Sequence, residues 1–478
     1  MHLDTDSCYR ALAAHDARFD GRFFVGVTST RIYCRPVCTV RTPRRENCRF
    51  FGSAAAAEVA GFRPCLRCRP ELAPGNAGID AGARLAQAAI RMIEDGTIDE
   101  GGVERLASRI GVTSRHLRRI FSDEFGVSPI DYAQTQRLLL AKRLLTDTTL
   151  PVTDVALTSG FASVRRFNAA FKTRYRMAPT RLRRAAAPAA LPAVLEFDLP
   201  YRPPYDFPAM LAFLARRAVQ GVEQVDAKTY RRTLHIEHAG SVHRGYIEVF
   251  ARPARNALRL RVSASLARVV PHVLSLARQA FDVACDPSEI AARLGELATR
   301  KPGLRVPGTF DGFELATRAV LGQQVSVRAA TTLAARLAEQ LGDPLDHAPH
   351  GLARTFPAAS VVAGVQDKTL AALGILPARA RTVRALAQAV AEGKLELDVG
   401  ADVERARATL SNIPGIGPWT IEYIAMRALG WPDAFPASDL GILKAMAETK
   451  PSKASARSES WRPWRAYAVM HLWSRHDA

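Results

Sequence analysis

The pattern of apolar and polar positions divides this chain into segments with strand spacing and segments with helical spacing. Alternation through Phe23–Ile32 predicts strands near the N-terminus. Four later segments also read as strands: Leu195–Asp198, Tyr230–His238, His243–Val249 and Ala257–Val262. They predict an antiparallel sheet with intervening helices such as Phe207–Ala218, and from Phe281 onward the pattern is almost entirely helical. The chain is therefore expected to combine several domains of the α+β class.

One helical pattern occurs twice between residues 80 and 186. The first copy consists of a helix over Val103–Ile110, a turn at Gly111–Thr113 and a helix capped by Ser114; the second consists of Val152–Thr158, a turn at Gly160 and a helix that begins at Ser163. The stretch Pro129–Leu145 between them predicts one long amphipathic helix. The candidates for contacts with base edges on the second helices are Arg115, Arg119, Arg165 and Asn168. The alternative is a helical bundle with a solvated basic face.

Four of the seven cysteines occur as two close pairs. Three residues separate Cys34 from Cys38, two separate Cys65 from Cys68, and 26 lie between the pairs. This spacing suits a tetrahedral site for one Zn2+ ion, whose bonds to thiolate sulfur measure about 2.3 Å. Because such clusters are usually structural, the spacing alone leaves open whether a thiolate also reacts. Paired cysteines of this kind favour a reducing compartment over disulfides.

Near the C-terminus, the segment IPGIGP at residues 413–418 predicts a tight hairpin that precedes a helix over Trp419–Leu429. Proline fixes φ, and Gly415 and Gly417 permit φ above zero, so the backbone N–H groups can approach another surface closely. Together with the helix N-terminus, these groups suit a nucleic-acid phosphate. Asp439 follows Trp419 by twenty residues. An alternative is a plain connection between helices in which Asp439 only caps the next helix.

Composition narrows the class of protein. At 478 residues the chain is too long for one core, and 48% hydrophobic with 23% charged residues exclude disorder. The net charge is +20, with 30 Lys and Arg against 18 Asp and Glu in residues 1–190 and 36 against 28 in the remainder. This excess in both halves indicates an anionic polymer, and we expect double-stranded DNA. Since no run of about 18 apolar residues and no signal peptide occurs, we expect a cytoplasmic protein without a membrane partner.

The cysteine segment resembles the N-terminal domain of the Ada family of methyl sensors through YCRPxC, RREN and AGFRPCxRCRPE. The resemblance implies that all four paired cysteines bind zinc and that Cys34 takes a methyl group irreversibly from a DNA methylphosphotriester. Transfer would remove one negative charge from the cluster. One unit charge about 8 Å from a phosphate is worth roughly 2 kcal/mol, so methylation would act as an electrostatic switch on DNA affinity.

The repeated helical unit resembles the AraC-type DNA-binding domain through FxxxFGxSPxxY at Phe121–Tyr132 and GFxSxxxFxxxFKxxYxxxP from Gly160. The resemblance implies two recognition helices in successive major grooves on one face of DNA. It also implies a transcriptional activator with RNA polymerase as a partner. Ada proteins usually carry an O6-alkylguanine methyltransferase with a PCHR-type motif, which is absent here, so no O6-methylguanine repair is expected.

Residues 195–478 resemble the AlkA family of inducible 3-methyladenine DNA glycosylases from end to end. The matching stretches are LPYRPPYDFPAMLAFLARRAVQGVE, DGFELATRAVLGQQVSVRAATTLAARLA, LxNIPGIGPWT with DAFPASD, and WRPWRAYAVMHLW. The resemblance makes Asp439 the carboxylate that stabilises a cationic sugar, and it places Trp419, Tyr423 and Trp473 around a flipped, electron-poor base. Core packing is the alternative role for Trp473.

Three further positions carry expectations. Trp419 occupies the place where glycosylase–lyases of the same superfamily have a nucleophilic lysine, so a monofunctional enzyme that leaves an abasic site is expected. Gln324 occupies the place of the family's apolar DNA wedge, where AlkA has leucine, so it would fill the gap left by the flipped base with less stacking. The segment Glu448–Glu459 is expected to be looser than its surroundings.

Together these resemblances predict a multidomain α+β protein. The predicted parts are a small four-cysteine zinc α/β domain (1–78), an all-α double helix-turn-helix domain (79–186), a linker (187–194), an antiparallel-sheet subdomain (195–280) and an all-α helix-hairpin-helix glycosylase domain (281–478). The predicted function joins a methylphosphotriester-sensing activator, which accepts one methyl group stoichiometrically, to a DNA-3-methyladenine glycosylase II. Two alternatives stand beside it: a transcription regulator with an inactive glycosylase half, and a repair enzyme whose N-terminal half only tethers it to DNA.

Overall fold

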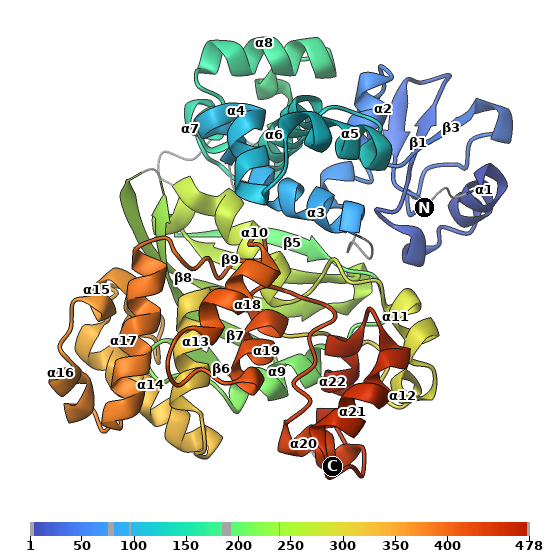
Figure 1. Ribbon diagram of the computed structural model, residues 1–478. Coiled ribbons are helices and arrows are strands. Elements are labelled where there is room, and N and C mark those ends of the chain that lie inside the picture. Colours follow the sequence, from blue (N-terminus) through green and yellow to red (C-terminus); the bar gives the residue numbers. More distant parts are fainter. Residues whose placement is uncertain (1–3, 75–80, 95–96, 184–192, 239, 476–478) are drawn as a thin grey trace. The chain divides into compact units, whose positions relative to one another are not determined.

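The computed structural model of the protein describes residues 4–74, 81–94, 97–183, 193–238 and 240–475 (Figure 1). The chain divides into two units: the first comprises Met1–Pro203, Arg252–Ser275 and Val283–Asp286, and the second comprises Pro204–Ala251, Leu276–Asp282 and Pro287–Ala478. Most of the predicted linker 187–194 lies outside the described residues. Throughout the described ranges, each helix is too short or too polar to cross a membrane.

A small mixed sheet near the N-terminus positions the paired cysteines. It consists of β1 (Phe24–Val27), β2 (Ile32–Cys34), β3 (Cys48–Phe51) and β4 (Arg63–Pro64), with helices α1 (Thr5–Ala13) and α2 (Ala54–Val59) before and after the first three strands. The strand order is β3-β1-β2-β4, in which β1 is antiparallel to both neighbours and β2 is parallel to β4. Since β2 ends at Cys34 and β4 directly precedes Cys65, their pairing brings the two cysteine pairs together.

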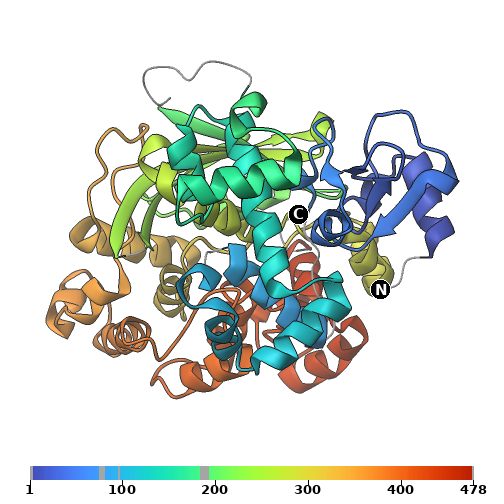
Figure 2. The ribbon, with the colours of Figure 1, turned by 90° about the horizontal axis from the view of Figure 1, so that it is seen from above.

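The helices that follow include both predicted copies of the helix-turn-helix pattern. They are α3 (Ala81–Glu94), α4 (Thr97–Ile110), α5 (Ser114–Phe125), α6 (Pro129–Asp147), α7 (Val152–Thr158) and α8 (Val164–Tyr175). In Figure 2, α6 is seen along its length, with α4 and α5 toward one end and α7 and α8 toward the other. The cap of α5 is Thr113, whose side chain accepts the N–H of His116, so the prediction of Ser114 was one residue too late. Ser163 caps α8 as expected.

Buried ion pairs join the segment after the last paired cysteine to α6. Glu71 accepts a hydrogen bond from the ammonium of Lys142, and their side chains are only 2% and 1% exposed. Arg69 binds both Glu71 and Asp147, the last residue of α6. Removing one partner of such a pair leaves an uncompensated buried charge, which costs about 3 to 5 kcal/mol. These contacts therefore fix the cysteine segment on α6.

Antiparallel pairing was correctly predicted for the strands beyond residue 193. In the first unit, β5 (Val194–Pro200) pairs with β9 (Ala257–Ser263), and in the second unit β7 (Thr229–His238) pairs with β8 (Ser241–Arg252). A short strand that the pattern did not predict, β6 (Glu223–Val225), extends the second group. Three residues give too little alternation to distinguish a strand from a loop.

The remainder of the second unit is helical, as predicted. Its helices are α9 (Phe207–Ala215), α11 (Pro287–Leu294), α12 (Glu296–Thr299), α13 (Gly312–Leu321), α14 (Val327–Leu341), α15 (Ala359–Ala363), α16 (Asp367–Ala372), α17 (Pro377–Ala391), α18 (Val403–Ser411), α19 (Pro418–Arg427), α20 (Leu440–Ala445), α21 (Pro451–Ser458) and α22 (Arg465–Trp473), while the residues of α10 (Val270–Ala280) are divided between the units. The expectation of a loose segment over Glu448–Glu459 was wrong, because α21 occupies most of it.

The predicted hairpin lies between α18 and α19. Gly415 has φ +90°, a conformation that a residue with a side chain rarely adopts. Gly417 instead has φ −95° and is the N-cap of α19, so of the two glycines that permit a positive φ only Gly415 uses it. The backbone therefore turns once and then enters the helix directly, with Pro418 in its first turn.

Candidate functional sites

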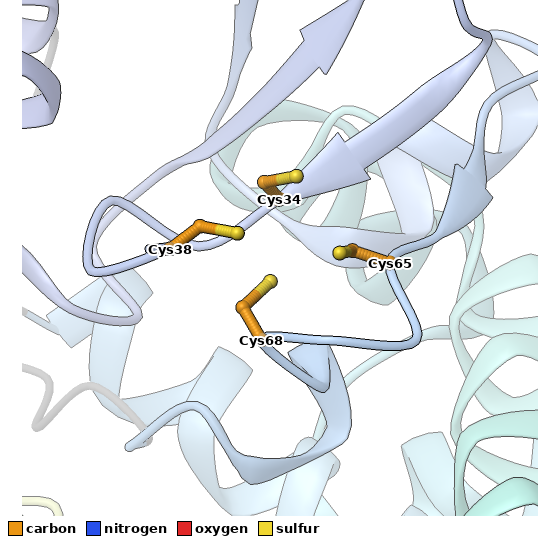
Figure 3. Close-up of side chains that lie close together, drawn as sticks. All are labelled: Cys34, Cys38, Cys65 and Cys68. Carbon is orange, nitrogen blue, oxygen red and sulfur yellow. The ribbon is translucent and has the colours of Figure 1, made fainter. Parts of the chain in front are cut away.

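Four sulfur atoms converge at the end of strands β2 and β4. Figure 3 shows Cys34 at the end of β2, Cys38 in the loop that follows, and Cys65 and Cys68 on the segment after β4, all turned toward a common space. Their sulfur atoms all lie within 4.8 Å of one another. Cys34, Cys38 and Cys65 are buried, while Cys68 is partly exposed.

The thiols shift one another's acidity in opposite directions. Hydrogen bonds with the other three cysteines, together with burial, raise the pKa of the Cys34 thiol, whereas hydrogen bonds with Cys34, Cys38 and Cys68 lower the pKa of Cys65. Four sulfurs at such short range, three of them on buried residues, cannot all be anionic unless a cation lies among them. An all-cysteine set that can surround one point is the donor set of structural zinc. The cluster therefore fits one Zn2+ ion.

Backbone N–H groups distinguish Cys34 from the other three cysteines. The pairs are Arg35 N to Cys68 Sγ at 3.4 Å, Arg67 N to Cys65 Sγ at 3.4 Å, and Val40 N to Cys38 Sγ. Among the residues that the structure describes, none donates a backbone N–H to Cys34 Sγ. Because an N–H donor withdraws electron density from sulfur, Cys34 retains the most electron-rich sulfur of the set.

All four candidate base-reading residues are exposed on the second helix of their repeat. Arg115 and Arg119 lie on α5, and Arg165 and Asn168 lie on α8. The Arg119 guanidinium is 3.0 Å from Nδ1 of His116, one turn earlier on the same helix. A contact with DNA requires these side chains to be exposed. The side chains of a basic face that contacts only solvent would be exposed in the same way.

Asp439 is held by three hydrogen-bond donors from three separate places in the second unit. Its Oδ2 accepts the indole N–H of Trp419 at 2.8 Å, and its Oδ1 accepts the indole N–H of Trp473 at 3.0 Å and the backbone N–H of Ile442 at 3.0 Å. The last bond makes Asp439 the N-cap of α20. The capping role first considered as an alternative is thus real, and it coexists with the contact to both tryptophans.

Aromatic side chains gather around this carboxylate. Trp419 and Tyr423 stack with ring centroids 5.1 Å apart and planes 14° from parallel, and Tyr423 lies 6.3 Å from Trp473. Trp473 also stacks on Phe213 of α9, with ring centroids 6.2 Å apart. The structure therefore brings together the three predicted aromatic residues and adds Phe213, which lies within the first matching stretch but carried no signal of its own.

Two arginines lie behind the aromatic rings. Arg427 donates to the hydroxyl of Tyr423 at 2.6 Å and to the carbonyls of Pro307 and Gly308. Its guanidinium lies 5.0 Å from the centre of the Phe213 ring, and that of Arg217 lies 3.8 Å from the same ring. Although burial alone would raise the pKa of Tyr423, the charges of Arg427 and Arg217 lower it. The sequence pattern gave no indication of this pair.

Gln324, the expected wedge, lies in the short loop between α13 and α14. Its side chain is exposed and its φ is +54°, in the left-handed region. Gly415 and Gly417 lie in the hairpin, which the adjacent Gln323 contacts through its side-chain amide. The structure thus places the predicted wedge loop and the predicted phosphate-binding hairpin side by side.

Comparisons with known proteins agree with the domains and the two sites described above. Four family models match the chain: the metal binding domain of Ada over residues 7–71, a helix-turn-helix domain over 106–185, the AlkA N-terminal domain over 196–311, and the HhH-GPD superfamily base excision DNA repair protein over 317–465. In the solved structure of a 3-methyladenine DNA glycosylase from Archaeoglobus fulgidus, 98% of the chain superposes on 59% of this one with TM-score 0.50 at 20% identity, which shows the shared fold.

Two curated relatives are similar in sequence. A probable bifunctional transcriptional activator/DNA repair enzyme AlkA of Mycobacterium tuberculosis is 41% identical over 99% of this chain and 97% of its own length. The DNA-3-methyladenine glycosylase 2 of Escherichia coli K12 is 38% identical over 58% of this chain and 96% of its own length.

The fold and the two clusters define a zinc-binding helix-turn-helix protein joined to a helix-hairpin-helix base excision glycosylase. The match over nearly the full length of the mycobacterial protein identifies the family more closely. The chain belongs to the family of bifunctional transcriptional activator/DNA repair AlkA proteins.

Proposed function

We propose that this chain senses methylphosphotriesters in DNA through Cys34, activates transcription in response, and hydrolyses the N-glycosidic bond of alkylated bases such as 3-methyladenine. The observation that carries the enzymatic part is the Asp439 carboxylate, which two indoles and a helix N-terminus hold among aromatic rings. The proposed parts are residues 1–78, 79–186, 187–194, 195–280 and 281–478. The protein would act on double-stranded DNA in the cytoplasm.

Base excision by this site would depend on charge and orientation. As the glycosidic bond breaks, the sugar gains positive charge, and a carboxylate held in place stabilises that charge without further reorganisation. Each oxygen of Asp439 accepts an indole N–H, so the plane of the carboxylate is fixed. Water would then add to the sugar carbon opposite the departing base, giving the free base and an abasic site.

The aromatic geometry limits where the flipped base can lie. A base inserted between two rings needs them about 7 Å apart, which is twice the usual stacking distance. Trp419 and Tyr423, at 5.1 Å, already contact each other. The base would therefore stack on an outer face of this pair, next to Trp473. Electron-poor alkylpurines gain most from such a face.

Trp419 also indicates whether the enzyme only hydrolyses the glycosidic bond or cleaves the DNA strand as well. A glycosylase that cleaves the DNA strand forms a Schiff base through an amine, and Trp419 provides an indole at that position. We propose a monofunctional hydrolase. Borohydride should trap no covalent adduct between this protein and alkylated DNA, and a trapped adduct would contradict the assignment.

At the metal centre, the sulfur of Cys34 would attack the methyl carbon of a methylphosphotriester. An S–CH3 bond forms, the C–O bond to phosphate breaks, and the phosphate leaves as a diester anion. Bound zinc would keep the cysteines deprotonated at neutral pH. The absence of a backbone N–H donor to Cys34 among the described residues favours this sulfur over the other three. Mass spectrometry after reaction with methylphosphotriester DNA would locate the methyl group, and a methyl on another cysteine would overturn the assignment.

Loss of one negative charge at the cluster would strengthen binding to DNA, and the exposed side chains on α5 and α8 would then hold a promoter. Arg115, Arg119, Arg165 and Asn168 are the proposed base contacts. RNA polymerase is the proposed partner of the bound activator. Promoter binding that does not change on methylation would favour the alternative in which residues 1–186 serve only as a tether.

The experiment that tests the enzymatic proposal is release of 3-methyladenine from alkylated duplex DNA. Asp439→Asn keeps the size of the side chain and one oxygen acceptor but removes the charge, so release should fall by about a thousandfold or more. The methyl transfer to Cys34 serves as the matched control and should not change. If wild-type protein releases no base, the chain is a regulator with an inactive glycosylase half.

A further inference from the structure

A single glutamine bridges the wedge loop and the hairpin. The side-chain amide of Gln323 donates to the carbonyl oxygen of Gly415 at 2.9 Å and to Oγ1 of Thr420 at 3.0 Å. Gly415 lies at the turn of the hairpin, and Thr420 lies in the first turn of α19. One side chain therefore connects segments that are 92 and 97 residues away in sequence.

The backbone of the same residue is also held by a hydrogen bond. The carbonyl oxygen of Gln323 accepts a hydrogen bond from the guanidinium of Arg379 on α17. With both its side chain and its carbonyl bound, Gln323 has little freedom to move. The next residue, Gln324, has φ +54° although it carries a side chain. Such a conformation costs free energy and persists where neighbouring contacts fix it.

The hairpin is attached to the same helix. The hydroxyl of Thr382 on α17 donates to the carbonyl of Pro414 at 2.8 Å. A Cβ atom added at Gly415 would lie 2.3 Å from Thr382 Oγ1, so hairpin and helix are in close contact. Since Arg379 and Thr382 lie three residues apart on α17, one face of this helix supports both the hairpin and the loop.

We propose that Gln323 is a positioning residue that holds Gln324 at a fixed offset from the hairpin. This inference rests on the proposed function and on two expectations from the sequence, namely that the hairpin binds the DNA backbone and that Gln324 fills the gap left by the flipped nucleotide. A wedge without an apolar side chain gains little free energy from stacking on the bases. Its ability to fill the gap therefore depends more on the position in which it is held. Gln323 supplies that placement because its N–H groups reach an acceptor in the hairpin and an acceptor in α19 together.

The variant Gln323→Leu tests this role, since leucine retains most of the volume and provides no donor. Gln323→Glu is the matched control for size and polarity, because its carboxylate has no proton to donate to the Gly415 carbonyl, although it can still accept one from the hydroxyl of Thr420. Gln323→Leu should lower the single-turnover rate of base release by about tenfold through the loss of two hydrogen bonds, and Gln323→Glu should lower it as well through the loss of the bond to Gly415. They should also reduce the fluorescence rise of 2-aminopurine at a flipped position by a similar factor.

A double-mutant cycle with Gln324→Ala separates positioning from general support. In a protein without the wedge side chain, Gln323→Leu should change release and flipping by less than about twofold, because nothing remains to be positioned. An equal loss in both backgrounds would mean that Gln323 only supports the hairpin, and the proposal would be wrong. If Gln323→Leu does not fold, Thr420→Val removes one of the two acceptors and should give the same pattern with a smaller loss.

The two measurements also distinguish this inference from the proposed function. If wild-type protein flips the base but does not release it, the glycosylase activity is contradicted. The double-mutant cycle of Gln323 and Gln324 can then still be measured by fluorescence. Base release that Gln323→Leu leaves unchanged would contradict only the positioning role. Absence of both signals from wild-type protein would overturn both. The fluorescence of the native tryptophans, all of which lie between residues 419 and 473, reports whether each variant is folded there.

Discussion

The cysteine cluster and the Asp439 site both concentrate negative charge, but they compensate it in opposite ways. Four sulfurs within 4.8 Å of one another need a cation among them. Asp439 instead receives three N–H groups of the protein itself. A metal ion allows a thiolate to remain anionic and reactive. Fixed N–H donors instead orient a carboxylate whose charge assists the reaction and is still present when the reaction ends. The first arrangement suits one transfer for each molecule, and the second suits turnover.

The two regions also differ in how they are assembled from the chain. All four cysteines lie within residues 34–68, on two loops that adjacent strands bring together. The three side chains at the Asp439 site come from α19, the N-cap of α20 and the end of α22. Loss of the metal should therefore disturb one local segment, whereas the carboxylate depends on the packing of several helices. Each region can be altered without the other.

The largest effect is expected from Cys34→Ser. A hydroxyl is a far weaker nucleophile than a thiolate, so transfer of methyl from a methylphosphotriester should be abolished. Base release should remain within about twofold of wild type, because Asp439 and its donors are untouched. Mass spectrometry and a base-release assay on the same preparation would measure both. A parallel loss of base release would show that the two regions are coupled.

Removal of the metal with a strong chelator should have the next largest effect. Without a cation the four crowded sulfurs cannot all remain anionic, so methyl transfer should fall by about a hundredfold or more. All five tryptophans lie between residues 419 and 473, so their fluorescence reports the other region selectively. Its thermal transition should shift by less than about 2 °C. A larger shift would mean that the cluster also stabilises the glycosylase region.

Substitution of the indole donors should have an intermediate effect. Trp419→Phe and Trp473→Phe each keep an aromatic ring and remove one N–H from Asp439. A hydrogen bond to a charged group is worth about 1.5 to 3 kcal/mol, so base release should fall by roughly tenfold to a hundredfold in each. Trp464→Phe, which changes a buried tryptophan outside this cluster, is the control and should release base normally. Unchanged rates would show that the carboxylate needs only its cap.

The smallest effect concerns pH. Burial, together with the charges of Arg475 and Lys301, lowers the pKa of His471 to about 4. The native state therefore keeps this imidazole neutral, whereas the unfolded chain binds a proton near pH 6.5. Stability is fully present above pH 6.5 and declines as pH falls, by about 2 kcal/mol at pH 5.

Urea unfolding followed by tryptophan fluorescence at pH 7 and pH 5 would measure this decline. His471→Gln should flatten the dependence, because glutamine does not titrate. Base release at pH 7 by this variant should match that of wild type. An equally steep decline in the variant would assign the pH dependence to another group. Asp282 would not be that group, because burial raises its pKa to about 6, and a raised carboxyl pKa makes the native state more stable as pH falls.

The sequence correctly predicted which residues lie together where they are close in the chain or belong to a shared motif. The cysteine spacing predicted a cluster that the structure brings together, and Trp419, Tyr423, Trp473 and Asp439 lie in contact as the resemblance implied. The double role of Asp439 as cap and as acceptor of two indoles could not be foreseen. It depends on the directions in which α19, α20 and α22 approach one another, and no local pattern encodes these directions.

The failures have a similar origin. Gln323 was passed over in favour of Gln324, because two adjacent glutamines look alike until one is seen to contact the hairpin. The sequence showed only that Gly417 permits a positive φ, and it did not show that the start of a helix holds this residue in an N-cap conformation instead. The helix α21 was missed because serine, lysine and alanine in alternation have little apolar periodicity.

The ion pairs between the cysteine segment and α6 have a consequence for how this family could exchange parts by recombination. A crossover placed between residues 71 and 142 would combine a foreign zinc segment with the resident helix. Lys142, whose side chain is 1% exposed, would then be left buried without Glu71. The smallest piece of the N-terminal half that can be transplanted intact therefore extends from the cysteines through Asp147, and a chimaera that divides it should be soluble only if Lys142 is replaced as well.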